Sequence, residues 1–205
     1  MSEHTPLRTP TIGHHGLPKN AINGFNRCIE MSGATVAQLE AFQAHVRQIK
    51  HPAVLRRSAR HLCAQLVTSR YMHKAASHLP DVSTWEKHVD ETLQTTLGEC
   101  ETASQPIEVT LGRLAITDSS LVAVIEDDTL GPEVESLYEG LELRNPLPRA
   151  NVRLTYFDTS SLTRFKRQHF ASLREAFTDL QGQTVVLGPL QAISPSHWRA
   201  GEHAS

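Results

Sequence analysis

The side chains that could carry out chemistry in this sequence are mainly cations, and they are concentrated in two segments. Residues 41–80 contain seven Lys or Arg residues and no acidic residue. Residues 143–174 contain seven further basic residues and one acid, Asp158. Cations at this density favour contact with the phosphate or carboxylate groups of a polyanion. The cations predicted to make such contacts are Arg47, Lys50, Arg56, Arg57, Arg60, Arg70, Lys74, Arg164, Lys166 and Arg167.

The first segment also has a spacing that suits phosphates. Arg56 and Arg60 are one turn apart in the helix expected there, and Arg57 lies beside them, so their forked guanidinium groups could bridge adjacent phosphates. Two other uses of the cations remain open. They could be neutralised by residues 81–142, which contain fifteen acids and two bases, or they could form a contact between copies of the chain. The sequence pI of about 6.6 is lower than is usual for a dedicated nucleic-acid-binding domain.

A second chemistry that the sequence could support is metal-dependent phosphodiester hydrolysis. The acids Glu126–Asp128 follow an expected strand, and Glu142 lies on the next expected strand, two residues before Arg144. Carboxylates on neighbouring strands can hold Mg²⁺, with Asp128 and Glu142 as the ligands. This pattern resembles the core of the restriction-type nucleases. It departs from that core because Arg144 stands where a lysine is expected, and because the acids follow the hairpin.

A third candidate is a helix-turn-helix over residues 23–49, with Gly33 in the turn and Leu39 on its buried face. Two helices joined by a glycine turn are also ordinary bundle geometry, and this alternative stays open.

The cysteines predict neither a disulfide framework nor a zinc site. Cys28, Cys63 and Cys100 are odd in number, and none belongs to a CxxC pair. The spacing of the histidines and of the glycines indicates no metal ligand set and no phosphate-binding loop. We therefore expect no catalytic residue, no cofactor and a reducing, cytoplasmic compartment. No apolar run reaches the ~18 residues that span a bilayer, and the first twenty residues lack an apolar signal segment.

Hydrophobic periodicity predicts an α+β fold, in which an N-terminal helical bundle precedes a mostly antiparallel sheet with one long C-terminal helix. The expected helices cover residues 21–31, 35–49, 53–79, 85–97 and 161–180. The expected strands cover residues 107–111, 121–125, 140–144, 152–157 and 184–187. The corresponding organisation is a flexible tail at 1–20, a basic helical bundle at 21–98, an α+β domain at 106–190 and a flexible tail at 191–205.

Charge and predicted fold together favour a non-enzymatic accessory or regulatory protein. Its expected partner is nucleic acid or an acidic macromolecule, with no membrane, and a homo-oligomer remains open. One alternative is an enzyme that acts on a phosphorylated or carboxylated substrate in a cleft between the two halves. The other alternative is a structural subunit whose alternating charge blocks drive its assembly.

Overall fold

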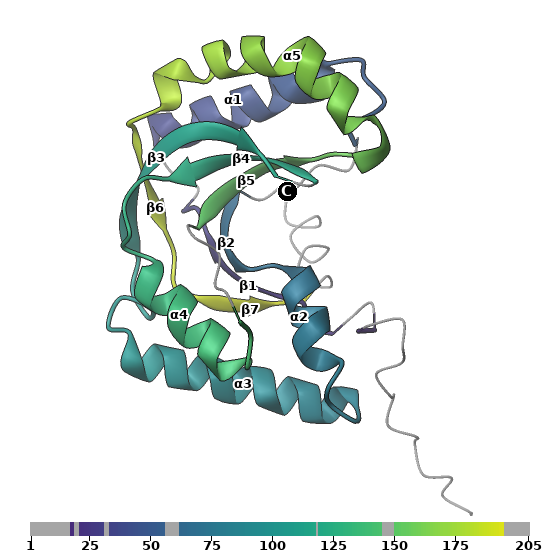
Figure 1. The fold of residues 1–205 in the computed structure, drawn as a ribbon. Helices are drawn as coiled ribbons and strands as arrows, with labels where there is room; N and C mark the ends of the chain where they lie inside the picture. Colours follow the sequence, from purple (N-terminus) through teal and green to yellow (C-terminus); the bar gives the residue numbers. More distant parts are fainter. Residues whose placement is uncertain are drawn as a thin grey trace, which may run out of the picture.

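A computed structural model describes residues 17–18, 21–30, 33–55, 62–117, 119–144 and 150–194. In this part of the chain, seven antiparallel strands form one sheet in the order β6-β3-β4-β5-β2-β1-β7 (Figure 1). The strands are β1 (Gly24–Cys28), β2 (Cys63–Val67), β3 (Ile107–Ile116), β4 (Ser120–Ile125), β5 (Asn151–Tyr156), β6 (Thr184–Leu187) and β7 (Gln191–Ile193).

The sheet curls so strongly that β6 returns to the end of β1. Ile29, which follows β1, forms an isolated bridge with Leu187 of β6. The backbone N–H of Glu30 donates to the carbonyl of Val186 at 2.9 Å. Figure 1 shows the result as a C-shaped section, in which β3, β4 and β5 face β2, β1 and β7 across a concave side.

Two groups of helices pack around this sheet, and all but α2, which borders the concave side, cover its outer, convex side (Figure 1). The first group lies over β5 and β6, and the second group lies beside β2 and β7. Asp81 begins α3 by accepting a hydrogen bond from the backbone N–H of Thr84 at 2.8 Å. The first group contains α1 (Ala34–Gln48), α5 (Leu162–Ala176) and the short 3₁₀ helices η1 (Thr159–Ser161) and η2 (Thr178–Leu180), and the second contains α2 (Ser69–Ala76), α3 (Val82–Glu99) and α4 (Gly131–Gly140).

The predicted N-terminal helical bundle is wrong. Residues 24–28 form a strand, which also excludes the helix-turn-helix, and the expected helix over 53–79 contains β2 and the short α2 instead. All five residues of β2 are buried. A strand covered on both faces shows no alternation of polar and apolar residues, so periodicity cannot distinguish it from a buried helix. Residues 56–61 of the expected helix lie outside the described residues.

Two predictions for the C-terminal half are also wrong. The expected strand over 140–144 is the end of α4 and the turn after it, because Val134, Leu137, Tyr138 and Leu141 form one buried helical face. The last helix, α5, is not the long C-terminal helix: it has 15 residues against 18 for α3, and two strands follow it. The predicted helices over 35–49 and 85–97 and the strands matching β3, β4, β5 and β6 are confirmed, whereas β7 was expected to be part of a tail.

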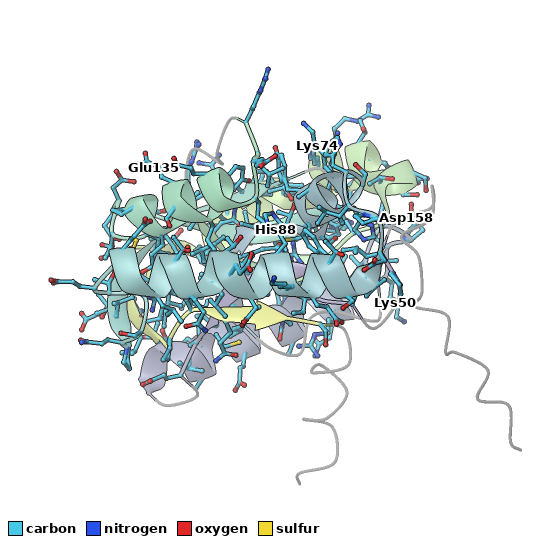
Figure 2. The ribbon with its side chains drawn as sticks, turned by 90° about the horizontal axis from the view of Figure 1, so that it is seen from below. Lys50, Lys74, His88, Glu135 and Asp158 are labelled. Carbon is cyan, nitrogen blue, oxygen red and sulfur yellow. The ribbon has the colours of Figure 1, made fainter. Side chains whose placement is uncertain are left out.

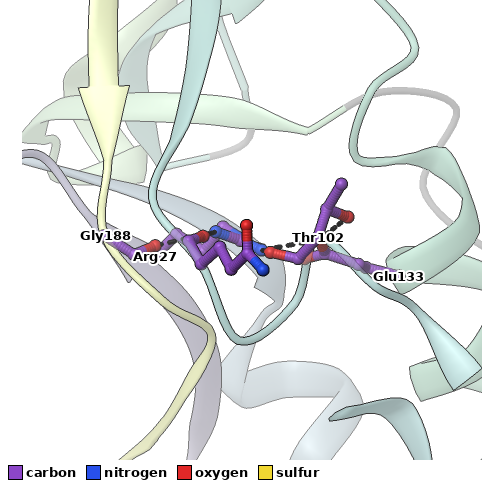
Figure 3. A network of polar contacts seen from close by, with 5 residues as sticks. Arg27, Thr102, Glu133 and Gly188 are labelled. Atoms are coloured by element: carbon purple, nitrogen blue, oxygen red, sulfur yellow. Dashed lines mark hydrogen bonds and ion pairs between the residues drawn. The ribbon is translucent and has the colours of Figure 1, made fainter. Parts of the chain in front are cut away.

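One buried ion pair connects segments that are far apart in the sequence (Figure 3). Arg27 of β1 and Glu133 of α4 are both fully buried, and two hydrogen bonds of 2.8 and 2.7 Å join the guanidinium to the carboxylate. The other three N–H groups of Arg27 donate to the backbone carbonyls of Thr102, Gln105 and Gly188. The hydroxyl of Thr102 donates to Glu133 at 2.9 Å. All five donors of this arginine are therefore used, which is what makes its burial tolerable.

Removing the charge of Glu133 is expected to destabilise the fold strongly. Glu133→Gln leaves the Arg27 guanidinium buried without a counter-charge, so the free energy of unfolding should fall by about 3–5 kcal/mol in urea denaturation. The matched control is Lys87→Met, which breaks an exposed Lys87–Glu91 pair 3.6 Å apart and should cost less than about 1 kcal/mol. A loss for Glu133→Gln no larger than that of the control would contradict the structural role of the pair.

Candidate ligand-binding groove

A groove with a volume of about 520 Å³ opens on the concave side of the sheet, between β1 and β2 on one side and β4 and β5 on the other. This volume lies within the range of sites for small organic ligands. Most of the lining residues have polar side chains, and the lining consists of Asn23, Gly24, Asn26, Gln65, Thr68, Ser69, Arg70, Tyr71, Thr117, Ser119, Ser120, Val122, Asn151, Arg153 and Tyr156.

Strand register brings the amides of this groove into one row. Asn26 of β1 is directly opposite Gln65 of β2, and Gln65 is directly opposite Asn151 of β5. Side chains alternate between the two faces of a strand, so residues two apart share a face. Arg153 therefore lies on the same face as Asn151. The row of amides is thus assembled from three adjacent strands that are distant in the sequence.

Three buried polar atoms of the lining have no hydrogen-bond partner among the described residues: Asn26 Oδ1, Ser120 Oγ and Arg153 Nε. The Asn26 and Ser120 residues are only 5% and 3% exposed. An unsatisfied buried polar group costs about 1–3 kcal/mol, and native structures normally pair such groups with protein, water or ligand. Their gathering in one groove indicates a site for a polar molecule.

Some of the N–H donors of the Arg153 guanidinium hold it in place, and the others have no partner within the described structure. One of its terminal nitrogens donates to Gln65 Oε1 and the other donates to the hydroxyl of Tyr156. Its central carbon lies 4.5 Å from the centre of the Tyr156 ring, at a distance typical of a cation–π contact. Three of its five N–H groups make no hydrogen bond within the described structure, and one of these, on Nε, is buried. A fixed arginine with free donors suits forked binding of a phosphate or carboxylate.

The lining suits recognition better than acid–base catalysis. Amides and hydroxyls both donate and accept hydrogen bonds, and two arginines supply positive charge. No carboxylate, imidazole or thiol is among the lining residues in the described part of the chain. These are the groups that most often act as general bases or nucleophiles near neutral pH.

The predicted cations are distributed over several surfaces, and one of them, Arg70, lines the groove. Arg47 and Lys50 lie exposed at and just after the end of α1, whereas Lys74 borders a second cavity of about 270 Å³ with His78 and His88. In Figure 2, Lys50 and Lys74 lie towards one end of the molecule and Glu135 lies at the other. Arg56, Arg57 and Arg60 fall outside the described residues. The remaining predicted cations, exposed on α5, are Arg164, Lys166 and Arg167.

The structure brings the cations at the end of α1 and the cations on α5 to the same end of the fold. His51, after α1, packs against Phe165 and His169 of α5, with ring centres 5.4 and 5.5 Å apart. The end of α1 with its cations is therefore next to the start of α5. Within the described residues, no ion pair with a carboxylate neutralises the following cations: Arg47, Lys50, Lys74, Arg164, Lys166 and Arg167.

The structure lacks the strand arrangement that the alternative metal site of Asp128 and Glu142 assumed. Asp128 precedes α4 and Glu142 follows it, so the two acids flank a helix of ten residues, which is about 15 Å long. Glu142 is not on a strand and cannot face Asp128 across a sheet. No group of three or more His, Cys, Asp or Glu side chains that could hold a metal ion occurs in the described part of the chain.

The groove residues Asn26, Gln65, Ser120 and Arg153 were not predicted as site residues. The signal that could have found two of them is a polar amide inside an apolar strand, as in the sequences GFNRC and CAQLV.

A comparison with known families and curated proteins gives no match to this chain. Among the described residues, each helix is too short or too polar to cross a membrane.

Removing an unpartnered hydroxyl should not harm the fold. Ser120→Ala in the groove and Thr155→Val outside its lining each delete a buried hydroxyl that lacks a hydrogen-bond partner. We expect both variants to keep the free energy of unfolding or to raise it by up to about 1 kcal/mol. Urea denaturation tests this, and a loss of more than about 1 kcal/mol in Ser120→Ala would show that its hydroxyl is bonded within the protein.

Proposed function

We propose that the protein binds a phosphate-bearing ligand of nucleotide size in this groove, either as a free nucleotide or as the phosphorylated end of a nucleic acid strand. The observation that carries the proposal is the convergence of Asn26 Oδ1, Ser120 Oγ and Arg153 Nε, all buried and without protein partners, in one groove. The proposed role is recognition without catalysis, in the cytoplasm that the cysteine pattern predicts.

Arg153 supports the anionic part of this ligand. Its remaining N–H groups can form two parallel bonds to one phosphate, and partial burial strengthens such bonds relative to water. The described lining contains no acid that would compete for the guanidinium. The cation–π contact with Tyr156 limits the rotamers of Arg153, which reduces the entropy lost when the phosphate binds.

The row of amides supports the rest of the ligand. Asn26, Gln65 and Asn151 present both donors and acceptors, which match the edges of bases and the hydroxyl groups of sugars. A bare inorganic anion would leave most of the groove unfilled. The exposed cations without ion pairs at the end of α1 and on α5 lie on the outer side of the sheet and are not part of the groove lining, so a longer polyanion would reach them only beyond the groove.

The enzymatic alternative retains one supporting observation. Arg70 and Arg153, from the two halves of the chain, border the same groove, as a substrate cleft between those halves would require. The described lining lacks an acid–base pair, which favours binding over turnover. Release of product from a phosphorylated compound during the binding assay would decide for the enzyme.

Loss of the Arg153 charge should remove phosphate binding. In isothermal titration calorimetry we expect the full chain to bind adenosine 5′-monophosphate and a 5′-phosphorylated oligonucleotide more tightly than inorganic phosphate or adenosine. Arg153→Met should weaken nucleotide binding by at least about tenfold, the effect of losing one charge-assisted contact of 1.5–3 kcal/mol. Added salt should weaken binding of the oligonucleotide more than binding of the mononucleotide if the exposed cations take part.

Matched variants separate the groove from general effects on the fold. Ser120→Ala should also weaken nucleotide binding, whereas Thr155→Val should leave it unchanged. Binding of the mononucleotide alone would identify a free nucleotide as the ligand, and preference for the oligonucleotide would identify a strand end. If none of the phosphate compounds binds, or if Arg153→Met binds them as well as the wild type, the proposal is wrong.

A further inference from the structure

Two cysteines lie directly opposite each other on neighbouring strands. In the antiparallel pairing of β1 with β2, Cys28 is the partner of Cys63. The next pair along, Ile29 and Leu62, is joined by a backbone hydrogen bond of 2.9 Å. Hydrogen-bonded and non-hydrogen-bonded pairs alternate in such a ladder, so the cysteines occupy a non-hydrogen-bonded pair, where Cα atoms are about 4.5 Å apart. A disulfide needs a Cα separation of about 4.4–6.8 Å, which this position meets.

The two thiols already interact and have different environments. A hydrogen bond between their side chains lowers the pKa of Cys28 to about 7, against the opposing effect of burial. The same hydrogen bond and burial raise the pKa of Cys63. Cys28 is half-buried, whereas Cys63 is buried. Cys28 is therefore the sulfur that meets a reagent from solution as a thiolate, which is the nucleophilic form.

We propose that Cys28 and Cys63 are a thiol–disulfide site, in which Cys28 attacks a low-molecular-weight disulfide and Cys63 resolves the product. First, the Cys28 thiolate bonds to one sulfur of the small disulfide, whose S–S bond breaks, and a small thiolate leaves with the electron pair. Cys63 then gives its proton to water and bonds to the Cys28 sulfur, and the second small thiolate leaves. Two protein thiols are oxidised, and one small disulfide is reduced to two thiols.

The site adjoins the proposed ligand groove but does not depend on it. Cys28 is two residues from Asn26 on β1, and Cys63 is directly opposite Arg153 on β5. Disulfide formation depends only on the pairing of β1 with β2. In a reducing compartment such a bond is expected to be transient, so oxidation and reduction would alternate.

Oxidised glutathione should link the two cysteines in the folded full-length chain. Mass spectrometry of an unreduced digest is expected to show a Cys28–Cys63 peptide that dithiothreitol removes. Cys100→Ser is the control, because Cys100 is a buried cysteine at the end of α3, and this variant should form the same link. Failure of the wild-type chain to form the link in glutathione buffers, or a link that uses Cys100, overturns the proposal.

The order of the two steps can be tested with single variants. Cys63→Ser should accumulate one glutathione on Cys28, because the resolving sulfur is missing, whereas Cys28→Ser should react at least about tenfold more slowly at Cys63. Cys63→Ala replaces Cys63→Ser if the buried hydroxyl prevents folding, as judged by circular dichroism. Equal modification of Cys63 in Cys28→Ser would contradict the assigned roles.

The reactivity of Cys28 should also show its thiolate character. Among the described residues, Cys63 on β2 and Arg153 on β5 are the titratable and charged groups that act on Cys28 and its partner. Alkylation of Cys28 by iodoacetamide should rise with pH through a midpoint of about 7, because the thiolate is the reactive form. Cys100, whose pKa is raised by burial and by Glu133 and Glu99, should react only at higher pH. Equal pH midpoints for Cys28 and Cys100 would rule out the attacking role of Cys28.

Discussion

The buried pair of Arg27 and Glu133 is the interaction on which the arrangement of the elements depends. It joins β1 to α4, and the carbonyls of Thr102, Gln105 and Gly188 tie the segment after α3 and the segment between β6 and β7 to the same guanidinium. Two charges without water are tolerable only when every donor finds an acceptor. The pair therefore restricts the relative placement of these four segments, and it lies where the curled sheet brings the end of β6 next to β1.

Strand β1 carries a structural function on one face and a candidate chemical function on the other. Arg27 points towards α4, whereas Asn26 and Cys28 lie on the opposite face, towards the groove and Cys63. A one-residue slip would exchange these faces. An irregularity between Phe25 and Asn26 shifts the register of β1 against β2, and the ion pair holds the strand in the shifted register. The register of β1 against β2 therefore determines both the stability of the fold and which side chains line the groove.

Periodicity in the sequence was most informative where an element has one covered face, although the buried strand β4 was also predicted. α1 and β3 each have an exposed side, so their apolar residues recur at helical or strand spacing, and both were predicted. β1 and β2 are buried almost throughout, and their short sequences have no alternation that could indicate a strand. Overlooking β2 led to a second error. Without β2, no N-terminal strand is expected to pair with β5, so the N-terminal segment was interpreted as a separate helical bundle.

The candidate site was harder to predict than the fold, because charge alone does not reveal what an arginine does. Arg27 and Arg153 are both isolated arginines in strands, and neither was selected among the cations of the sequence. The fold uses all five N–H donors of Arg27 and two of those of Arg153. The first arginine therefore has nothing left for a ligand, whereas the second is positioned with donors to spare. This difference arises from strand register and burial, which place carbonyls around one guanidinium and a groove around the other, and no local pattern of residues encodes it.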